Sequence, residues 1–94
     1  MRAGQRVGDA LFGIHYLPND RGHARLGMAV GLRVAGKAVR RNRIRRCVRE
    51  SFRLNQQVLP PVDVFVSARS AARDATGPEM FASLERLWRQ ICKR

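Results

Sequence analysis

The densest group of chemically active side chains is a run of arginines over residues 40–53. This segment contains seven arginines and one acidic residue, Glu50. On a helix turning by about 100° per residue, one side is apolar and collects Ile44, Cys47, Val48, Ser51 and Phe52. The opposite side collects Asn42, Arg46, Arg49 and Arg53, with Arg45 beside them. The spacing therefore predicts an amphipathic helix that is anchored by its apolar side and presents a row of guanidinium groups.

Three interpretations of this charged side compete. A merely solvated helix face mixes charges of both signs in i,i+4 pairs, and here only Glu50 can pair. A helix lying on a membrane needs a broader apolar face than this one offers. Nucleic acid fits best because guanidinium groups bind phosphates through paired hydrogen bonds and stack on bases. Strands flank the helix and no helix-turn-helix or dimer signal is visible, so the sequence favours RNA over DNA.

The charge of the whole chain also points to a polyanionic partner. Its 94 residues include 19 Lys and Arg against seven Asp and Glu, which gives a net charge of +12. Such a domain repels itself unless a polyanion neutralises it. The length suits one domain, expected to span residues 1–94, and the 45% hydrophobic content argues against disorder.

Neither a membrane-spanning run nor a signal-peptide pattern occurs in the sequence, so we expect a cytoplasmic protein without a membrane partner. Cys47 and Cys92 are the only cysteines. Two cysteines so far apart form no zinc-binding motif, and no metal site is predicted. We expect both to be reduced thiols, buried on the apolar sides of helices.

Apolar periodicity and turn signals divide the chain into alternating elements. Strands are predicted over residues 10–17, 24–30 and 62–68, and helices over residues 38–54 and from Pro78 to the C-terminus. The first two strands should form a hairpin around the turn at residues 18–22. Residues 31–37 form a basic connection, and residues 70–77 a loop. Trp88 belongs to the apolar stripe of the last helix, so we expect it in the core.

The first two strands predict a sheet with unlike faces. Side chains alternate between faces along a strand, so one face receives Phe12, Ile14, Tyr16, Leu26, Met28 and Val30. The other face receives Gly13, His15, Gly27 and Ala29. Such small side chains cannot cover a sheet, and we expect them to leave a shallow trough. Composition alone, or close helix packing, would also produce small residues here.

A resemblance to a known family rests on the helix and its neighbours. Residues 37–53, KAVRRNRIRRCVRESFR, resemble the signature helix of the bacterial ribonuclease P protein component. The core of that signature is Arg41-Asn42-Arg43, followed by Arg45-Arg46 and Arg49-Glu50. The preceding strand, the following strand and the terminal helix of the family resemble RLGMAV at 25–30, DVFVSAR at 63–69 and LWR at 87–89. The resemblance covers residues 4–94 in the expected order, which makes it far more specific than a basic run.

The resemblance implies an α+β fold. The fold is a small α-β sandwich, with a mixed sheet packed against the arginine-rich helix and a C-terminal helix. The connection through the arginine-rich helix would be a left-handed crossover between parallel strands, against the usual handedness. Family members usually open with a further helix bearing aromatic residues. This sequence begins after that helix, near Gly4, so we expect the helix to be absent.

The resemblance also implies a function. The chain would be the protein subunit of ribonuclease P, an endonuclease that removes the 5′ leader from precursor tRNA. Its partners would be ribonuclease P RNA and precursor tRNA. The RNA would carry the catalysis and bind Mg²⁺, while the protein would hold no cofactor and be inactive alone.

The expected binding residues form two groups. By position in the family pattern or on the charged helix face, the residues expected to contact RNA are Arg33, Lys37, Arg41, Asn42, Arg43, Arg45, Arg46, Arg49 and Arg53. Gly13, His15 and Ala29 would line a cleft for the single-stranded leader, in agreement with the small-residue face.

Two other functions are alternatives to a ribonuclease P subunit. His15 and His23 are the only imidazoles and could cleave RNA as an acid–base pair. Neither has a nucleophile or clustered carboxylates around it in the sequence, so we expect no catalytic residue in the protein. The stronger alternative is another basic ribonucleoprotein component, such as a ribosomal protein.

Overall fold

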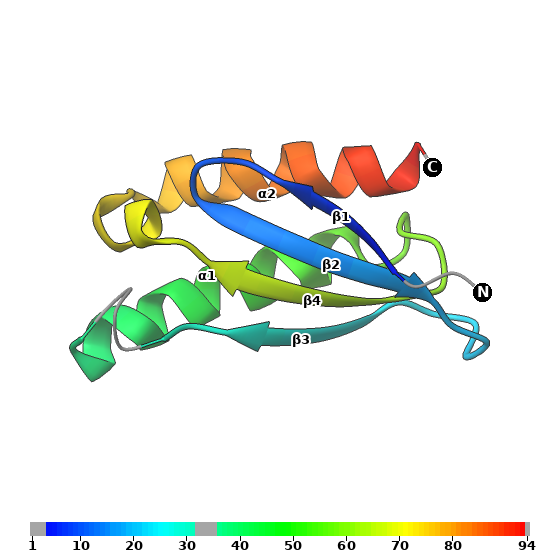
Figure 1. Cartoon of the computed structure of the whole chain (residues 1–94), viewed down its shortest axis with the longest axis horizontal. Helices are drawn as coiled ribbons and strands as arrows, with labels where there is room; N and C mark the ends of the chain where they lie inside the picture. Colours follow the sequence, from blue (N-terminus) through cyan, green and yellow to red (C-terminus); the bar gives the residue numbers. More distant parts are fainter. Residues whose placement is uncertain (1–3, 32–35, 94) are drawn as a thin grey trace.

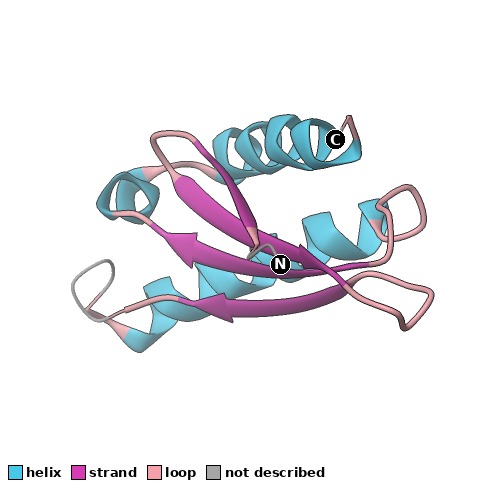
Figure 2. Cartoon of the chain, turned by 45° about the vertical axis from the view of Figure 1, so that its right-hand side comes forward, coloured by secondary structure: helices cyan, strands magenta, loops and turns pink. Residues whose placement is uncertain are grey.

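Residues 4–31 and 36–93 are described by a computed structural model, shown in Figure 1. Its elements in chain order are β1 (Gln5–Gly8), β2 (Phe12–Pro18), β3 (Arg25–Ala29), α1 (Ala38–Asn55), β4 (Val62–Ala68), the 3₁₀ helix η1 (Ser70–Asp74) and α2 (Gly77–Cys92). The strands form one sheet, and α1 and α2 pack on one of its faces (Figures 1 and 2). This is the α+β sandwich that the family resemblance implied. Neither described α-helix combines the length and apolar character needed to cross a membrane.

The order of the strands corrects the predicted hairpin. The sheet runs β1-β2-β4-β3, so β2 and β3 are not neighbours, and β4 lies between them. β4 pairs antiparallel with β2 and parallel with β3. The reason is visible at Asn19 in the predicted turn. Its backbone N–H donates to the carbonyl of Pro61 at 2.9 Å, and its side chain donates to Asp63 at 2.9 Å. The turn therefore arches over the start of β4 instead of closing a tight hairpin.

The actual hairpin joins β1 to β2, and periodicity along the sequence did not predict β1. This strand has four residues, of which only Val7 is buried, so its alternation is too short to recognise. Its turn is fixed by Asp9, whose carboxylate accepts hydrogen bonds from the backbone N–H groups of Leu11 and Phe12 at 2.9 and 3.0 Å.

The connection from β3 through α1 to β4 has the handedness that the family resemblance implied. In Figure 1 both strands point to the left, β4 lies above β3, and α1 passes behind them. Seen from the helix side with the strands pointing up, β4 therefore lies to the left of β3. This is a left-handed crossover, against the usual preference.

The core lies between the sheet and the two helices. The sheet contributes Phe12, Ile14, Tyr16, Val64 and Val66, and the helices contribute Ile44, Val48, Phe52, Met80, Leu84, Leu87, Trp88 and Ile91. Trp88 is only 1% exposed, which confirms its predicted place. Its indole N–H donates to the hydroxyl of Ser51 at 2.9 Å, and its ring packs edge-on against Phe52. These contacts fasten α1 to α2.

The cysteine prediction was half right. Both cysteines are free thiols, as expected, but Cys47 is half-buried and Cys92 is exposed. Cys92 lies one residue beyond Ile91, the last buried residue of α2, and its thiol contacts the carbonyl oxygen of Val58. Partial burial raises the pKa of the Cys47 thiol above its usual value.

Candidate RNA interface

The charged face of α1 is arranged as the sequence predicted. Ile44, Val48, Ser51 and Phe52 are buried against the core. On the other side, the exposed polar residues are Asn42, Arg46, Arg49 and Arg53, and Arg45 is half-buried beside them. The helix therefore holds this row of guanidinium groups on a folded support.

Some of the arginines are already engaged within the protein. Arg53 forms an ion pair with Glu50 one turn earlier. Arg43 donates to the carbonyl oxygen of Ala75, in the connection between η1 and α2, and so ties α1 to that connection. Arg41 donates to the carbonyl oxygen of Gly36 at 3.0 Å, just before the helix. Arg43 and Arg41 thus also stabilise the start of α1.

Three other arginines of α1 make no such internal contact in the described chain. Arg45, Arg46 and Arg49 have no ion pair or hydrogen-bonded partner within residues 4–31 and 36–93. Their positive charges have no acidic partner in that part of the chain, so they are available to bind phosphates.

The start of α1 adds positive potential to the same region. Lys37 is the N-cap residue, its side chain makes no capping hydrogen bond, and the first turn contains no acid. The first backbone N–H groups of a helix carry partial positive charge, which favours an anion there. Lys37 is exposed beside them. Arg33, which the resemblance also placed on this surface, lies outside the described residues.

A second surface is the sheet face opposite the helices, which we call the open face. Strand pairing places its side chains in rows across the sheet. The first row is Gly8, Gly13, Ser67 and Ala29, the second is Arg6, His15, Phe65 and Gly27, and the third is Leu17, Asp63 and Arg25. The expected cleft residues Gly13, His15 and Ala29 therefore share one face with several residues that the sequence pattern did not single out.

The open face is hollowed on both sides of its middle row. One hollow, of about 600 Å³, is lined among others by His15, Leu17, Gly27 and Phe65. The other, of about 880 Å³, is lined among others by Arg6, Gly13, His15, Phe65 and Arg69. Ala29 lines neither hollow. The predicted trough is thus present, but Phe65 and His15 divide it.

Glycines let Arg69 approach the sheet closely. A Cβ atom at Gly8 or Gly13 would lie 2.8 or 2.9 Å from Nη2 of Arg69, closer than real contacts allow. The guanidinium group thus lies directly over these two glycines. The backbone of Arg69 is also held in place, because its N–H donates to the carbonyl oxygen of Leu11 at 2.8 Å.

The acid on the open face is neutralised. Asp63 accepts two hydrogen bonds from Arg25, from Nε at 2.8 Å and from Nη2 at 2.9 Å. The pKa of Asp63 is lowered to about 2, most by the hydrogen bonds from Arg25 and next by the hydrogen bond from Asn19. Its charge is balanced at neutral pH, so it presents little repulsion to an anionic ligand.

Phe65 and Arg69 were the main omissions of the sequence analysis. The alternation in VDVFVSA carried a signal for Phe65, because Val62, Val64 and Val66 are buried on one face and Phe65 must face the other way. Arg69 gave no comparable signal, since its position over Gly8 and Gly13 depends on the strand order. No group of three or more His, Cys, Asp or Glu side chains that could hold a metal ion occurs among the described residues.

Comparison with known proteins identifies the family. A family model described as Ribonuclease P matches residues 1–92. The chain belongs to this family. It is 44% identical over 89 residues to the ribonuclease P protein component of Chromobacterium violaceum, covering 95% of this chain and 74% of the relative. For the same component of Cronobacter sakazakii, identity is 42% over 89 residues, with 95% and 75% covered.

A solved structure agrees with this assignment. The RNase P protein of Staphylococcus aureus is 33% identical and superposes with a TM-score of 0.86, covering 93% of this chain and 80% of that one. The principal functional prediction, a protein component of ribonuclease P, is therefore confirmed. Association with ribonuclease P RNA follows from membership in the family, and nothing in these comparisons supports a ribosomal protein.

Proposed function

We propose that the chain is the ribonuclease P subunit that binds the catalytic RNA through α1 and the 5′ leader of precursor tRNA on the open face. The observation that carries the proposal is the row of Arg45, Arg46 and Arg49, which project from a folded helix without an acidic partner in the described chain. Catalysis belongs to the RNA subunit, and the protein alone is inactive.

The charged face of α1 suits a folded RNA. Each guanidinium group that meets a phosphate releases condensed counterions, so affinity depends steeply on salt. Asn42 is exposed on the same side and offers a donor and an acceptor to a sugar or base edge. Lys37 extends the positive charge to the start of the helix, and Arg33 remains a predicted RNA contact. Arg41, Arg43 and Arg53 contribute charge while also making the internal contacts described above.

The open face suits an extended single strand. Gly13 and Gly27 let Arg69 and Phe65 lie close against the sheet, and Ala29 adds another small side chain to this face. Arg6 and Arg69 supply positive charge at one hollow, and His15 and Phe65 supply flat rings. Positive grooves combined with aromatic rings are typical of proteins that bind single-stranded nucleic acid.

Magnesium belongs to the RNA in this proposal. Mg²⁺ bound by the RNA would supply the activated water for cleavage. The protein's arginines neutralise phosphates where the leader and the catalytic RNA approach each other, and so lower the magnesium concentration that assembly requires. The working compartment is the cytoplasm, and RNA is preferred to DNA and to membranes.

Reconstitution tests the proposal. The chain is mixed with a bacterial ribonuclease P RNA and a precursor tRNA at low magnesium, and release of the leader is measured. We expect cleavage by the mixture and none by the protein alone. A basic ribosomal protein at the same concentration is the control and should not restore cleavage. Equal rescue by that control, or none by this chain, would refute the proposal.

A further inference from the structure

Phe65 is the least expected side chain on the open face. It lies in β4, between two neighbouring strands, yet it is 47% exposed, and its cross-strand partner on one side is a glycine. A single exposed apolar residue needs no special explanation. Two further observations distinguish this one.

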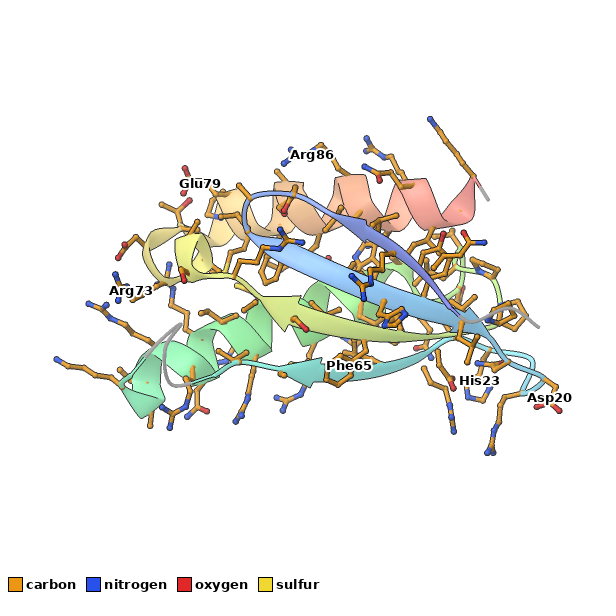
Figure 3. The ribbon with its side chains drawn as sticks, in the orientation of Figure 1. Asp20, His23, Phe65, Arg73, Glu79 and Arg86 are labelled. Atoms are coloured by element: carbon orange, nitrogen blue, oxygen red, sulfur yellow. The ribbon has the colours of Figure 1, made fainter. Side chains whose placement is uncertain are left out.

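The first observation is the support beneath the ring. Phe65 is paired across the strands with Gly27 of β3. A Cβ atom at Gly27 would lie 3.1 Å from Cδ1 and 3.6 Å from Cε1 of Phe65, so one edge of the ring lies over the glycine. Figure 3 shows Phe65 beside β3 on the open face. The absence of a side chain at residue 27 thus lets the ring rest on the edge strand.

The second observation is the shape of the surface around the ring. Phe65 and His15 line both hollows, of about 600 and 880 Å³, and so form the divide between them. Sites for small organic groups have similar volumes, roughly 300–1,000 Å³. A planar group entering either hollow therefore meets an aromatic side chain at its wall.

The charges around the ring select an anionic ligand. Arg6 and Arg69 line the larger hollow, where Asp9 is engaged with Ser83 and Arg86. In the smaller hollow Asp63 is neutralised by Arg25. A ligand with a flat apolar group and a nearby negative charge matches this arrangement, and a nucleotide has both.

We propose that Phe65 is a stacking platform for one nucleotide of the single-stranded leader, with the adjoining phosphate directed toward Arg69. The inference rests on the proposed function and adds the residue that holds a leader base. Stacking on an aromatic ring tolerates every base, so this contact adds affinity for the leader without selecting its sequence.

Binding by the reconstituted holoenzyme tests the platform. Dissociation constants are measured for precursor tRNA and for mature tRNA, with Phe65→Ala and Phe65→Trp variants. Phe65→Ala should weaken precursor binding at least about fivefold, the lower end for a lost base–aromatic stack, and leave mature tRNA binding unchanged. Phe65→Trp should keep the parent's affinity for both. Val58→Ala is the control, because Val58 is also exposed and apolar but lies outside both hollows.

An abasic scan of the leader locates the nucleotide. Single abasic sites are introduced along the leader, and each substrate is measured with the parent and with Phe65→Ala. At one position the abasic penalty should be present with the parent and absent with the variant. Identical penalties with both proteins at every position would overturn the proposal.

A second variant displaces the ring without removing it. Gly27→Val places a side chain where the edge of Phe65 lies, so precursor affinity should fall in the same direction as in Phe65→Ala. Gly31→Val is the matched control, because within the described residues nothing lies within 4 Å of a Cβ atom there. If the chain activates the RNA but Phe65→Ala binds precursor as the parent does, this inference is wrong and the proposed function stands. If the chain fails to activate the RNA, the proposed function fails.

Discussion

The two long helices, α1 and α2, pack on the same face of the sheet but differ in their N-terminal caps and in how many residues they bury. α2 begins with a capping box, in which the Thr76 hydroxyl accepts from the N–H of Glu79 and the Glu79 carboxylate accepts from the N–H of Thr76. It buries six residues in 16. α1 has neither a side-chain cap nor an acid in its first turn, and it buries four residues in 18.

The difference shows where each helix obtains its stability. α2 is favoured locally by its cap, by Pro78 in its first turn and by a wide apolar face. α1 lacks these local features, and its arginines repel one another along the outer face. It depends on tertiary contacts instead, chiefly those of Ser51 and Phe52 with Trp88. α1, which keeps its charges available for a ligand, is thus held in place by α2, whose own stability does not depend on a ligand.

The largest expected effect comes from removing two unpaired charges on α1. Arg45→Ala combined with Arg49→Ala should weaken binding to ribonuclease P RNA roughly 100-fold, at about tenfold for each lost charged contact. The slope of log affinity against log salt should also become shallower by about 1.4–1.8. Filter binding over a range of salt concentrations measures both quantities.

The matched control for that variant lies at the C-terminal end of α2. Arg89→Ala combined with Lys93→Ala removes the same total charge from exposed positions. It should change affinity and slope much less. Equal losses in the two double variants would show that net charge, and not the position of the charges on α1, determines binding.

The next effect concerns the bond that joins the helices. Ser51→Ala removes the acceptor of the buried Trp88 indole N–H. Leaving such a donor unsatisfied should lower the free energy of unfolding by about 1–3 kcal/mol, as measured by urea denaturation. RNA affinity of the folded variant should stay close to that of the parent. An unchanged denaturation midpoint would mean that α1 is supported by other contacts.

The smallest effect tests the uncapped start of α1. Lys37→Ser supplies a capping side chain at a residue that already has extended N-cap geometry. Stability should rise by about 0.5–1 kcal/mol, while the salt slope of RNA binding falls by about 0.7–0.9 because one charge is lost. Thr76→Ala is the complementary change on α2. It should lower stability by about 1 kcal/mol and leave the slope unchanged, and a stability gain from Lys37→Ser without any loss of slope would remove Lys37 from the interface.

The sequence predicted correctly those structural features that depend on a single helix or strand. The faces of α1, the burial of Trp88 and the small-residue face of the sheet all follow from periodicity within single segments. The order of the strands does not, because periodicity assigns side chains to faces but cannot say which strand is the neighbour. The predicted hairpin of residues 10–30 was wrong for this reason. The position of Arg69 over Gly8 and Gly13 could not be predicted without the observed order of the strands.

The central position of β4 has a consequence for how the chain matures. β3 pairs only with β4 within the described sheet, and β4 lies more than 30 residues after it, beyond the whole of α1. During synthesis the ribosome therefore releases the basic helix before the strand that completes its platform. Because distant pairings form late in folding, we expect an arrested chain that ends before residue 62 to lack both the completed sheet and the α2 contacts that hold α1 in place.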